Sequence, residues 1–248
     1  MSTVAAPPRT QASRHAALVR VTHWLTVLAF LALLITGGEI VISHPRFYWG
    51  ETGNVNMRPA FTLPIPSSRD TVPTGYKYVM PDQNGWSRYL HFEAAWLLVL
   101  CGLAYGIFGF WTGHFRRNLL PQRGQRSWPA YRQRMAQYLR RLPPQPGELR
   151  AYNVLQRTIY LLVIFVVVPL TIWTGLAMSL AIEGDFPWAV AVLGGRQSAR
   201  TLHFFLSWAL LLFLVVHVVM VARSGFRNRM RGMITGRVEP EDESGDDA

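Results

Sequence analysis

The chain has 248 residues, of which 50% are hydrophobic and 16% are charged, and its mean hydropathy is +0.14. This composition excludes disordered and collagen-like classes. The single cysteine excludes an intramolecular disulfide framework and a four-cysteine zinc or iron–sulfur site. The net charge of +11 comes from basic residues that flank apolar runs. That placement favours contact with membrane lipid, and we expect no nucleic-acid partner.

Four mostly apolar runs contain no Asp, Glu, Lys or Arg. They are Val21–Gly38, Ala94–Thr112, Thr158–Ile182 and Thr201–Ala222. About 20 apolar residues in a helix cross a bilayer, and only a helix satisfies its own backbone hydrogen bonds in lipid. The sequence therefore predicts an all-α integral membrane four-helix bundle over residues 15–225. The helices are expected at about 18–42, 88–112, 152–182 and 199–223.

The segments that flank these helices differ in charge. Of the 25 Lys and Arg residues, 18 lie in the N-terminal segment, the connection 113–157 and the tail from Arg223. The positive-inside rule therefore places both termini in the cytoplasm. We expect residues 1–14 to be disordered and residues 226–248 to form a cytoplasmic tail with an acidic end. The first apolar run is not a cleavable signal peptide, because bulky residues follow it.

The connections on the two sides are also expected to differ. Ser43–Ser87 forms a long external loop between helices 1 and 2, rich in proline and aromatic residues, which could lie on the membrane interface or pack against an external partner. The Arg-rich inner connection could form a short amphipathic helix over Trp128–Leu142, attracted to anionic lipid. Pro169 is expected to kink helix 3, and Cys101 to be a small packing residue.

Four of the seven histidines fall in or beside the apolar runs. They are His23 in helix 1, His91 at the start of helix 2, and His203 and His217 in helix 4. An imidazole in lipid needs a partner, for which a hydrogen bond between helices would be sufficient. However, His203 and His217 are 14 residues apart, which places both on one helix face, about 21 Å apart along the axis. One therefore lies near the external surface and the other near the internal surface.

The topology supplies each of these two histidines with a partner at its own depth. Helix 1 enters from inside, so His23 matches His217, and helix 2 enters from outside, so His91 matches His203. Two facing neutral imidazoles suit a six-coordinate haem iron with both axial positions filled. We therefore predict that the four histidines are axial ligands of two haem irons. Such centres pass electrons and leave no position open for oxygen, and we assign no catalytic residue.

Charged residues and glycines near the histidines extend this hypothesis. Arg20, Arg88 and Arg200 each lie three residues before a proposed ligand, where they could pair with haem propionates. The alternative is ordinary snorkelling arginine, which fits Arg20 better than the two external arginines. Glycines such as Gly37 and Gly175 remove bulk, so that a helix or a flat macrocycle can approach.

Two acids lie near the external ends of helices 1 and 2. They are Glu39 and Glu93. Glu93 could accept a proton from a quinol, although an interfacial acid paired with an arginine is the more ordinary interpretation.

With histidine ligands on helices 1, 2 and 4, the sequence resembles the four-helix di-haem cytochromes b over roughly residues 15–225. This group includes bacterial cytochrome b561 and the cytochrome b subunits of nickel–iron hydrogenases and formate dehydrogenases. The long external loop is most similar to that of thiosulfate-reductase-like cytochrome b subunits. The resemblance implies two haem b groups in a multi-pass protein of the bacterial inner (cell) membrane. It also implies electron transfer between membrane quinone and an external (periplasmic) redox partner, often a molybdopterin oxidoreductase.

Three functions remain open from the sequence. The favoured one is the electron-transfer subunit of a quinone-linked oxidoreductase, with the external loop as a docking surface. The second is a free-standing cytochrome b561-type quinone reductase that oxidises a small reductant such as superoxide, although the external charge is near balance. The third, a haem-free transporter or scaffold, requires the depth match of the histidines to be accidental.

Overall fold

Four long apolar helices make up most of the structure. The structure is a computed structural model, and it describes residues 15–54, 56–65, 83–121, 124, 126–140, 153–223 and 225–237. Three of them are α1 (Ala17–Ser43), α2 (Gln83–Trp111) and α8 (Arg196–Arg223). The remaining span is built from three consecutive pieces, α4 (Val154–Leu162), η3 (Val163–Val167) and α5 (Val168–Leu176). Each span is long and apolar enough to cross a bilayer. The prediction of an all-α membrane bundle is therefore confirmed.

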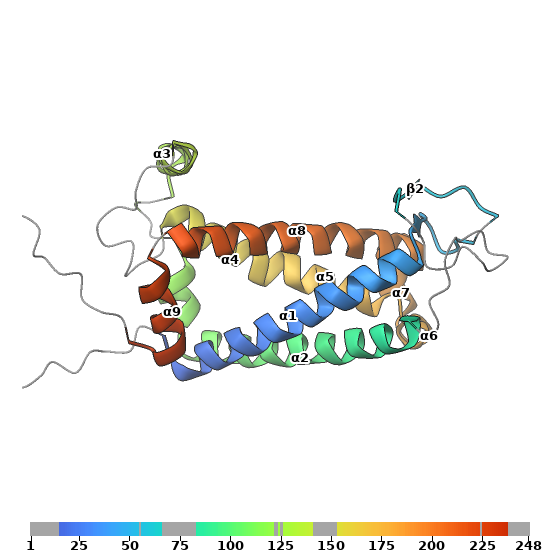
Figure 1. Cartoon of the computed structure of the whole chain (residues 1–248), viewed down its shortest axis with the longest axis horizontal. Coiled ribbons are helices and arrows are strands. Elements are labelled where there is room, and N and C mark those ends of the chain that lie inside the picture. Colours follow the sequence, from blue (N-terminus) through green and yellow to red (C-terminus); the bar gives the residue numbers. More distant parts are fainter. Residues whose placement is uncertain are drawn as a thin grey trace, which may run out of the picture.

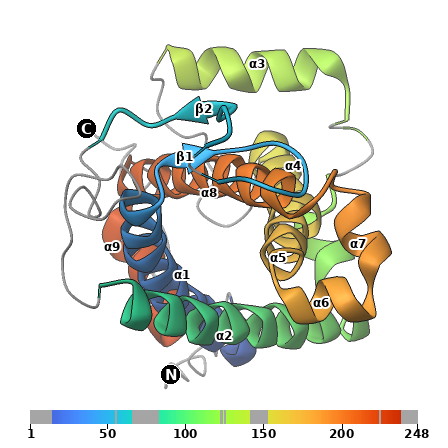
Figure 2. The ribbon, with the colours of Figure 1, turned by 90° about the vertical axis from the view of Figure 1, so that its right-hand side faces the viewer.

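The four spans run side by side around a common axis (Figures 1 and 2). Helix α1 packs along α2, and α5 packs along α8. Among the described residues, the α1–α2 pair contacts the α5–α8 pair less extensively than the helices within each pair contact each other. The chain enters α1 and leaves α8 at the same end of the bundle (Figure 1). We call this the inner end, following the positive-inside prediction, and the opposite end the outer end.

Small side chains form the seam between α1 and α2. Every seventh residue along α1 is buried, namely Thr22, Ala29, Thr36 and Ser43. The buried residues Ser87, Ala94 and Cys101 repeat at the same spacing in α2. Residues seven apart return to one helix face, and small residues there let two backbones approach closely in lipid. Cys101 is thus a packing residue, as its sequence context indicates.

The third span is irregular where the sequence predicts a kink. Pro169 has no N–H to donate to the carbonyl four residues earlier. Just before it, η3 is a π-helical segment in which the N–H of Val168 bonds to the carbonyl of Val163. The span ends at Leu176, earlier than the expected end near residue 182, because a tight turn follows and Ser179 is extended. Two short helices complete this outer connection, α6 (Leu180–Asp185) and α7 (Pro187–Ala191).

The described part of the external loop is fastened to the outer end of α8. Strands β1 (Arg46–Phe47) and β2 (Phe61–Thr62) form a two-stranded antiparallel sheet, which the sequence did not predict. Between them, the carbonyl of Gly50 accepts hydrogen bonds from the backbone N–H groups of Gln197 and Ser198. These groups lie in the first turn of α8, where N–H groups have no partner within the helix. The loop therefore caps α8.

Short helical elements lie at the inner end. They are η1 (Phe115–Leu119), α3 (Trp128–Leu139) and α9 (Phe226–Thr235). The segment from residue 226 is therefore not a plain tail, because it begins with a helix. Gly225 and Gly236 bound that helix, both with left-handed backbone conformation, which glycine adopts without strain. The expected disorder of residues 1–14, the loop aromatics within 66–82 and the acidic end lie outside the described residues.

Candidate functional site: two facing histidine pairs

The four membrane histidines come together as two facing pairs. His91 of α2 lies opposite His203 of α8, with 6.3 Å between the centroids of their rings. His23 of α1 lies opposite His217 of α8, with 6.4 Å between ring centroids. Because His203 and His217 are 14 residues apart in α8, about 21 Å along its axis, the pairs occupy two levels of the bundle. We call His91 with His203 the outer pair, and His23 with His217 the inner pair.

Both rings of the outer pair form hydrogen bonds through Nδ1. The Nδ1 atom of His203 lies 3.0 Å from the carbonyl oxygen of Thr171, which can only accept, so this nitrogen carries the proton. It also lies 3.1 Å from Oγ1 of Thr174. The Nδ1 atom of His91 lies 2.9 Å from Oγ1 of Thr36, whose own hydrogen is donated to a carbonyl one turn earlier in α1. Nε2 of each ring therefore keeps a free lone pair, the form that ligates a metal.

Two glycines lie against the outer rings. A Cβ atom at Gly175 would lie 3.3 Å from Cε1 of His203, and one at Gly37 would lie 3.6 Å from Cε1 of His91. Each ring therefore packs directly on the backbone of a neighbouring helix, α5 or α1. The sequence predicts that a helix or a flat macrocycle approaches these two glycines, and in the structure the approaching group is an imidazole ring.

Aromatic rings surround the inner pair. Trp24 meets His23 edge-on, with 5.3 Å between ring centroids. Phe213 stacks on His217 at 5.7 Å, and Tyr160 meets the same imidazole at 6.3 Å. The Nδ1 atoms of His23 and His217 are buried and have no hydrogen-bond partner among the described residues. The inner pair therefore lacks, among the described residues, the Nδ1 hydrogen bonds that the outer pair forms.

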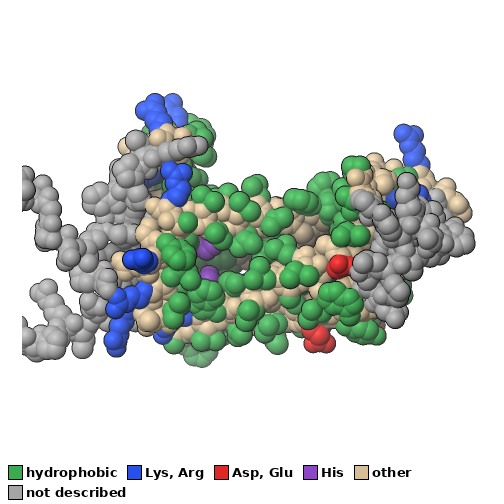
Figure 3. Space-filling view, viewed as in Figure 1, with side chains coloured by type: hydrophobic (Ala, Val, Ile, Leu, Met, Phe, Trp, Pro, Cys, Tyr) green, Lys and Arg blue, Asp and Glu red, His purple; other side chains and the backbone are tan. Residues whose placement is uncertain are grey.

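The spacing within each pair fits one iron atom between the rings. An imidazole nitrogen binds a metal at about 2.0 Å, and the ring centroid lies about 1 Å behind it, so two rings on opposite sides of one iron have centroids about 6 Å apart. Within the described residues, no group of three or more His, Cys, Asp or Glu side chains could hold a metal ion. The remaining ligands would therefore come from a macrocycle, and the donor set fits a haem. Histidine side chains are visible in a hollow of the apolar face of the bundle (Figure 3).

The three arginines expected near haem propionates have different surroundings. Nη1 of Arg20 donates to the carbonyl of Ile234 in α9 at 2.6 Å, and its Nε is buried without a partner among the described residues. Arg200 donates to two carbonyl oxygens of the external loop. Arg88 is exposed near the start of α2. Arg20 is thus held by α9 and Arg200 by the loop, and their pairing with propionates stays a prediction.

The other candidate groups lie outside the two pairs. Glu39 is half-buried and Glu93 is exposed, and neither forms an ion pair within the part of the chain that the structure describes. The function of Glu93 as a proton acceptor stays a prediction. His114 follows α2 and lies 2.9 Å from the side-chain amide of Asn118. Burial and the nearby Arg117 guanidinium lower the pKa of His114 below its ordinary value.

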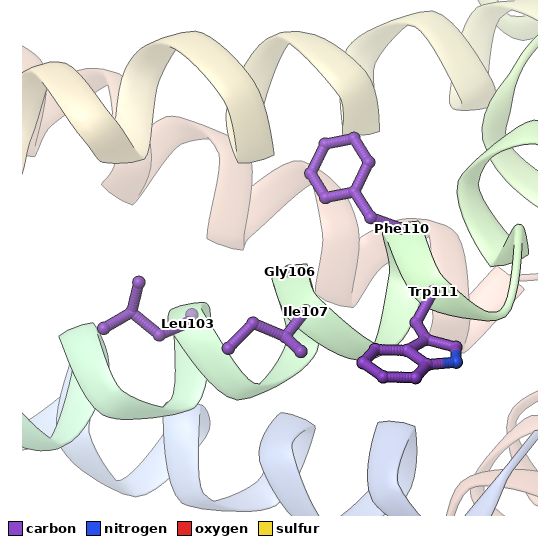
Figure 4. Close-up of a pocket in the computed structure, with 6 residues that line it drawn as sticks. Leu103, Gly106, Ile107, Phe110 and Trp111 are labelled. Atoms are coloured by element: carbon purple, nitrogen blue, oxygen red, sulfur yellow. The ribbon is translucent and has the colours of Figure 1, made fainter.

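An open apolar groove of about 590 Å³ runs along the inner half of α2 (Figure 4). Its lining residues are Gly102, Leu103, Gly106, Ile107, Phe110 and Trp111. None of the paired histidines lines it, and its lining is almost entirely apolar. We therefore interpret it as a lipid-facing surface.

The family model described as prokaryotic cytochrome b561 matches residues 14–236, which include both histidine pairs. The chain belongs to the prokaryotic cytochrome b561 family. It is therefore an integral membrane protein that transfers electrons by means of b-type haem. This membership excludes the haem-free transporter or scaffold.

Curated relatives have similar lengths and related names. A protein of Azospira oryzae named "Putative protein-methionine-sulfoxide reductase subunit YedZ1" is 30% identical over 84% of this chain and 89% of its own length. A "Probable Ni/Fe-hydrogenase B-type cytochrome subunit" of Cupriavidus necator is 27% identical over 85% of this chain and 79% of its own length. A protein of the same name from Bradyrhizobium diazoefficiens is 23% identical, with shares of 88% and 82%. No solved structure matches the chain significantly.

The sequence pattern does not single out the threonines that contact the outer pair. Thr36 lies 13 residues after His23, which is about 20 Å along α1 and hence at the depth of the outer pair. The depth argument that pairs the histidines could therefore have found it. Thr174 has no comparable signal, because threonines inside helices commonly bond to their own backbone.

Proposed function

We propose that the chain binds two b-type haems, one on each histidine pair, and passes electrons between membrane quinone and an external, periplasmic catalytic subunit of the molybdopterin class. The observation that carries the proposal is the repeated geometry, in which histidines from α1, α2 and α8 meet two by two at two levels with nearly equal ring spacing. Histidines that served only to join helices would have no reason to repeat this arrangement. When bound, a b-type haem supplies reversible one-electron transfer at its iron.

The side chains of the chain would hold and tune these haems. Each histidine pair would hold one haem iron between its two imidazoles, and the haem would then supply electron transfer rather than binding of oxygen or other small ligands. Arg20 at the inner level, and Arg88 and Arg200 at the outer level, supply positive charge one turn from a ligand, where propionates need it. The apolar spans keep water away, which strengthens the effect of each nearby charge and dipole on the iron.

A catalytic redox partner is proposed from the names of the relatives and from the outer end of the bundle, and its molybdopterin class from the resemblance of the sequence to thiosulfate-reductase-like cytochrome b subunits. Those names describe subunits of a hydrogenase and of a methionine-sulfoxide reductase. The external loop, held to α8 through Gly50, presents the exposed Trp49. Aromatic side chains are enriched at interfaces, and we propose this loop as the docking surface for the catalytic subunit.

The haem assignment is tested by a reduced-minus-oxidised visible spectrum, with haem per chain quantified, on membranes that overexpress the full chain. His203→Ala is expected to remove the outer haem and His217→Ala the inner haem, so each variant should keep half of the wild-type content. His114→Ala is the matched control and should keep all of it, because His114 is outside both pairs. Absence of b-type bands would refute the proposal, and loss of both haems from either variant would refute the pairing.

The partner is tested by purifying the tagged full-length chain from the membranes of its own cells. Stoichiometric molybdenum in the purified complex supports the proposal. Stoichiometric nickel would instead identify the catalytic subunit as a hydrogenase and refute the molybdopterin class. Oxidation of the reduced haems by added quinone tests the quinone link. A chain that purifies alone, and whose haems superoxide reduces, would support the free-standing quinone reductase instead.

A further inference from the structure

The two histidine pairs differ in the hydrogen bonds of their Nδ1 atoms. At the outer level, His91 donates to Oγ1 of Thr36 at 2.9 Å, and His203 donates to the carbonyl of Thr171 at 3.0 Å with Oγ1 of Thr174 at 3.1 Å. At the inner level, both Nδ1 atoms are buried and lack a partner among the described residues. The sites therefore differ in the polar groups behind the metal-binding nitrogens.

The two threonine hydroxyls are fixed acceptors. Thr36 is fully buried in the seam between α1 and α2, and its hydroxyl hydrogen is donated to the carbonyl of Ala32 at 2.7 Å. Thr174 is 1% exposed, and its hydroxyl lies 2.9 Å from the carbonyl of Leu170. Because each hydroxyl has one hydrogen and donates it to its own helix, its lone pairs face the imidazole N–H. Neither threonine can rotate away without leaving a buried hydrogen-bonding group unsatisfied.

A hydrogen bond from Nδ1–H makes Nε2 a stronger electron donor. When Nδ1–H donates to an oxygen, the ring gains negative character, and the basicity of the opposite nitrogen rises. Stronger donation stabilises oxidised iron more than reduced iron, which lowers the reduction potential. The same bond fixes the tautomer and the plane of the ring.

We propose that Thr36 and Thr174 are positioning residues for the outer haem. They hold His91 and His203 as Nδ1–H tautomers and lower the reduction potential of the outer haem, while the inner pair lacks such acceptors among the described residues. The two haem sites of the proposed function, on which this inference rests, are therefore unequal. With other contributions equal, an electron in the chain resides preferentially at the inner level.

The experiment is a redox titration of the full chain in membranes, followed at the haem absorption band, in wild type and in Thr36→Val and Thr174→Val. Thr36→Val removes the one acceptor that the described residues offer Nδ1 of His91. It should raise the reduction potential of the outer haem, shifting its equilibrium about three- to tenfold toward the reduced form. A tenfold shift corresponds to about 59 mV for one electron. Thr174→Val should have a smaller effect, because the carbonyl of Thr171 remains. The His23→Ala background, which keeps only the outer pair, assigns the shifted component.

Two further variants separate hydrogen bonding from packing. Thr36→Ser keeps the hydroxyl and should restore the wild-type potential. Thr22→Val lies in the same buried seam, but its hydroxyl bonds to the carbonyl of Leu18 and to no histidine, so the outer potential should not move. An unmoved potential in a Thr36→Val chain that retains its haem would overturn the inference, as would equal shifts in Thr36→Ser and Thr36→Val.

The outcomes also separate this inference from the proposed function. If Thr36→Val loses the outer haem, the shift in Thr174→Val decides the question alone. A wild-type chain without haem refutes the proposed function itself. A chain with both haems and with an unmoved outer potential in Thr36→Val refutes only the positioning by these threonines.

Discussion

Replacing Gly175 by alanine is expected to weaken the outer haem site by roughly 1 kcal/mol. The added Cβ would lie 3.3 Å from Cε1 and 3.6 Å from Nδ1 of His203, and the first of these contacts is tighter than ordinary van der Waals contact. His203 cannot yield freely, because its Nδ1 is bonded to Thr171 and Thr174 in the same helix as Gly175. Overpacking a fitted site costs about 1–3 kcal/mol, whereas the higher helix propensity of alanine stabilises the chain equally with and without haem and leaves haem affinity unchanged. Because only one of the two Cβ contacts is tight, the expected loss of haem affinity lies at the lower end of this range, about 1 kcal/mol.

The assay is the affinity of the outer site for haem, measured by haem titration of the purified chain in the His23→Ala background, where 1.4 kcal/mol corresponds to about tenfold. Gly37→Ala is the first control, because its Cβ would make an ordinary 3.6 Å contact with His91. Gly106→Ala is the second, because nothing lies within 4 Å of its added Cβ. If Gly175→Ala binds haem as tightly as Gly106→Ala, the tight fit of His203 against α5 is refuted.

Three further predictions concern the loop and the helix ends. Gly195→Ala should destabilise the docked conformation of the external loop by about 1–3 kcal/mol, because φ is +105° there and the added Cβ would lie 2.6 Å from the backbone of Gly50. Limited proteolysis of the loop measures this change, and Gly184→Ala is the control because nothing lies within 4 Å of its added Cβ. The Arg196 side chain bonded to Glu51 holds the pKa of that carboxyl below its ordinary 4.5. The ion pair therefore stabilises the docked loop above about pH 4.5 and is lost as the pH falls further, and Glu51→Gln should remove this acid dependence of loop protection. Asn153→Ala removes the capping box of α4 and should lower the free energy of unfolding by about 1 kcal/mol, measured by thermal denaturation in detergent.

Each of these predictions has an outcome that contradicts it. Unchanged proteolysis of Gly195→Ala would show that the loop does not depend on close approach to α8. A Glu51→Gln chain whose loop is still released by acid would assign the acid dependence to another group. Equal melting temperatures for wild type and Asn153→Ala would show that the cap contributes no stability.

The spans and the histidine pairing follow from the sequence because both depend on local regularities. An uncharged run of about 20 residues must satisfy its backbone within itself in lipid, so the spans can be read directly from the sequence. Helical periodicity puts His203 and His217 on one face, and the alternation of inward and outward spans matches His23 and His91 to their depths. Neither argument requires knowledge of which helices touch.

The end of the third span and the course of the external loop are determined by backbone hydrogen bonds, which the hydropathy of the sequence does not predict. The apolar run continues to Ile182, but the helix ends at Leu176 because backbone hydrogen bonds form a turn there. The cap that Gly50 places on α8 joins segments about 150 residues apart. Helix α9, whose Ile234 carbonyl accepts a hydrogen bond from Arg20, likewise lies in a polar, arginine-rich segment that hydropathy alone predicts to be a tail.

The contacts that tune the histidines were decided only by the tertiary structure. Helix α1 is apolar on nearly all sides, so hydropathy alone does not select the face that meets α2, because lipid solvates every apolar side chain about equally well. The choice is made by small residues that permit close approach and by buried polar groups that need partners, and both depend on the neighbouring helix. Thr36 therefore reaches His91, and Thr174 reaches His203, only once the spans are packed together.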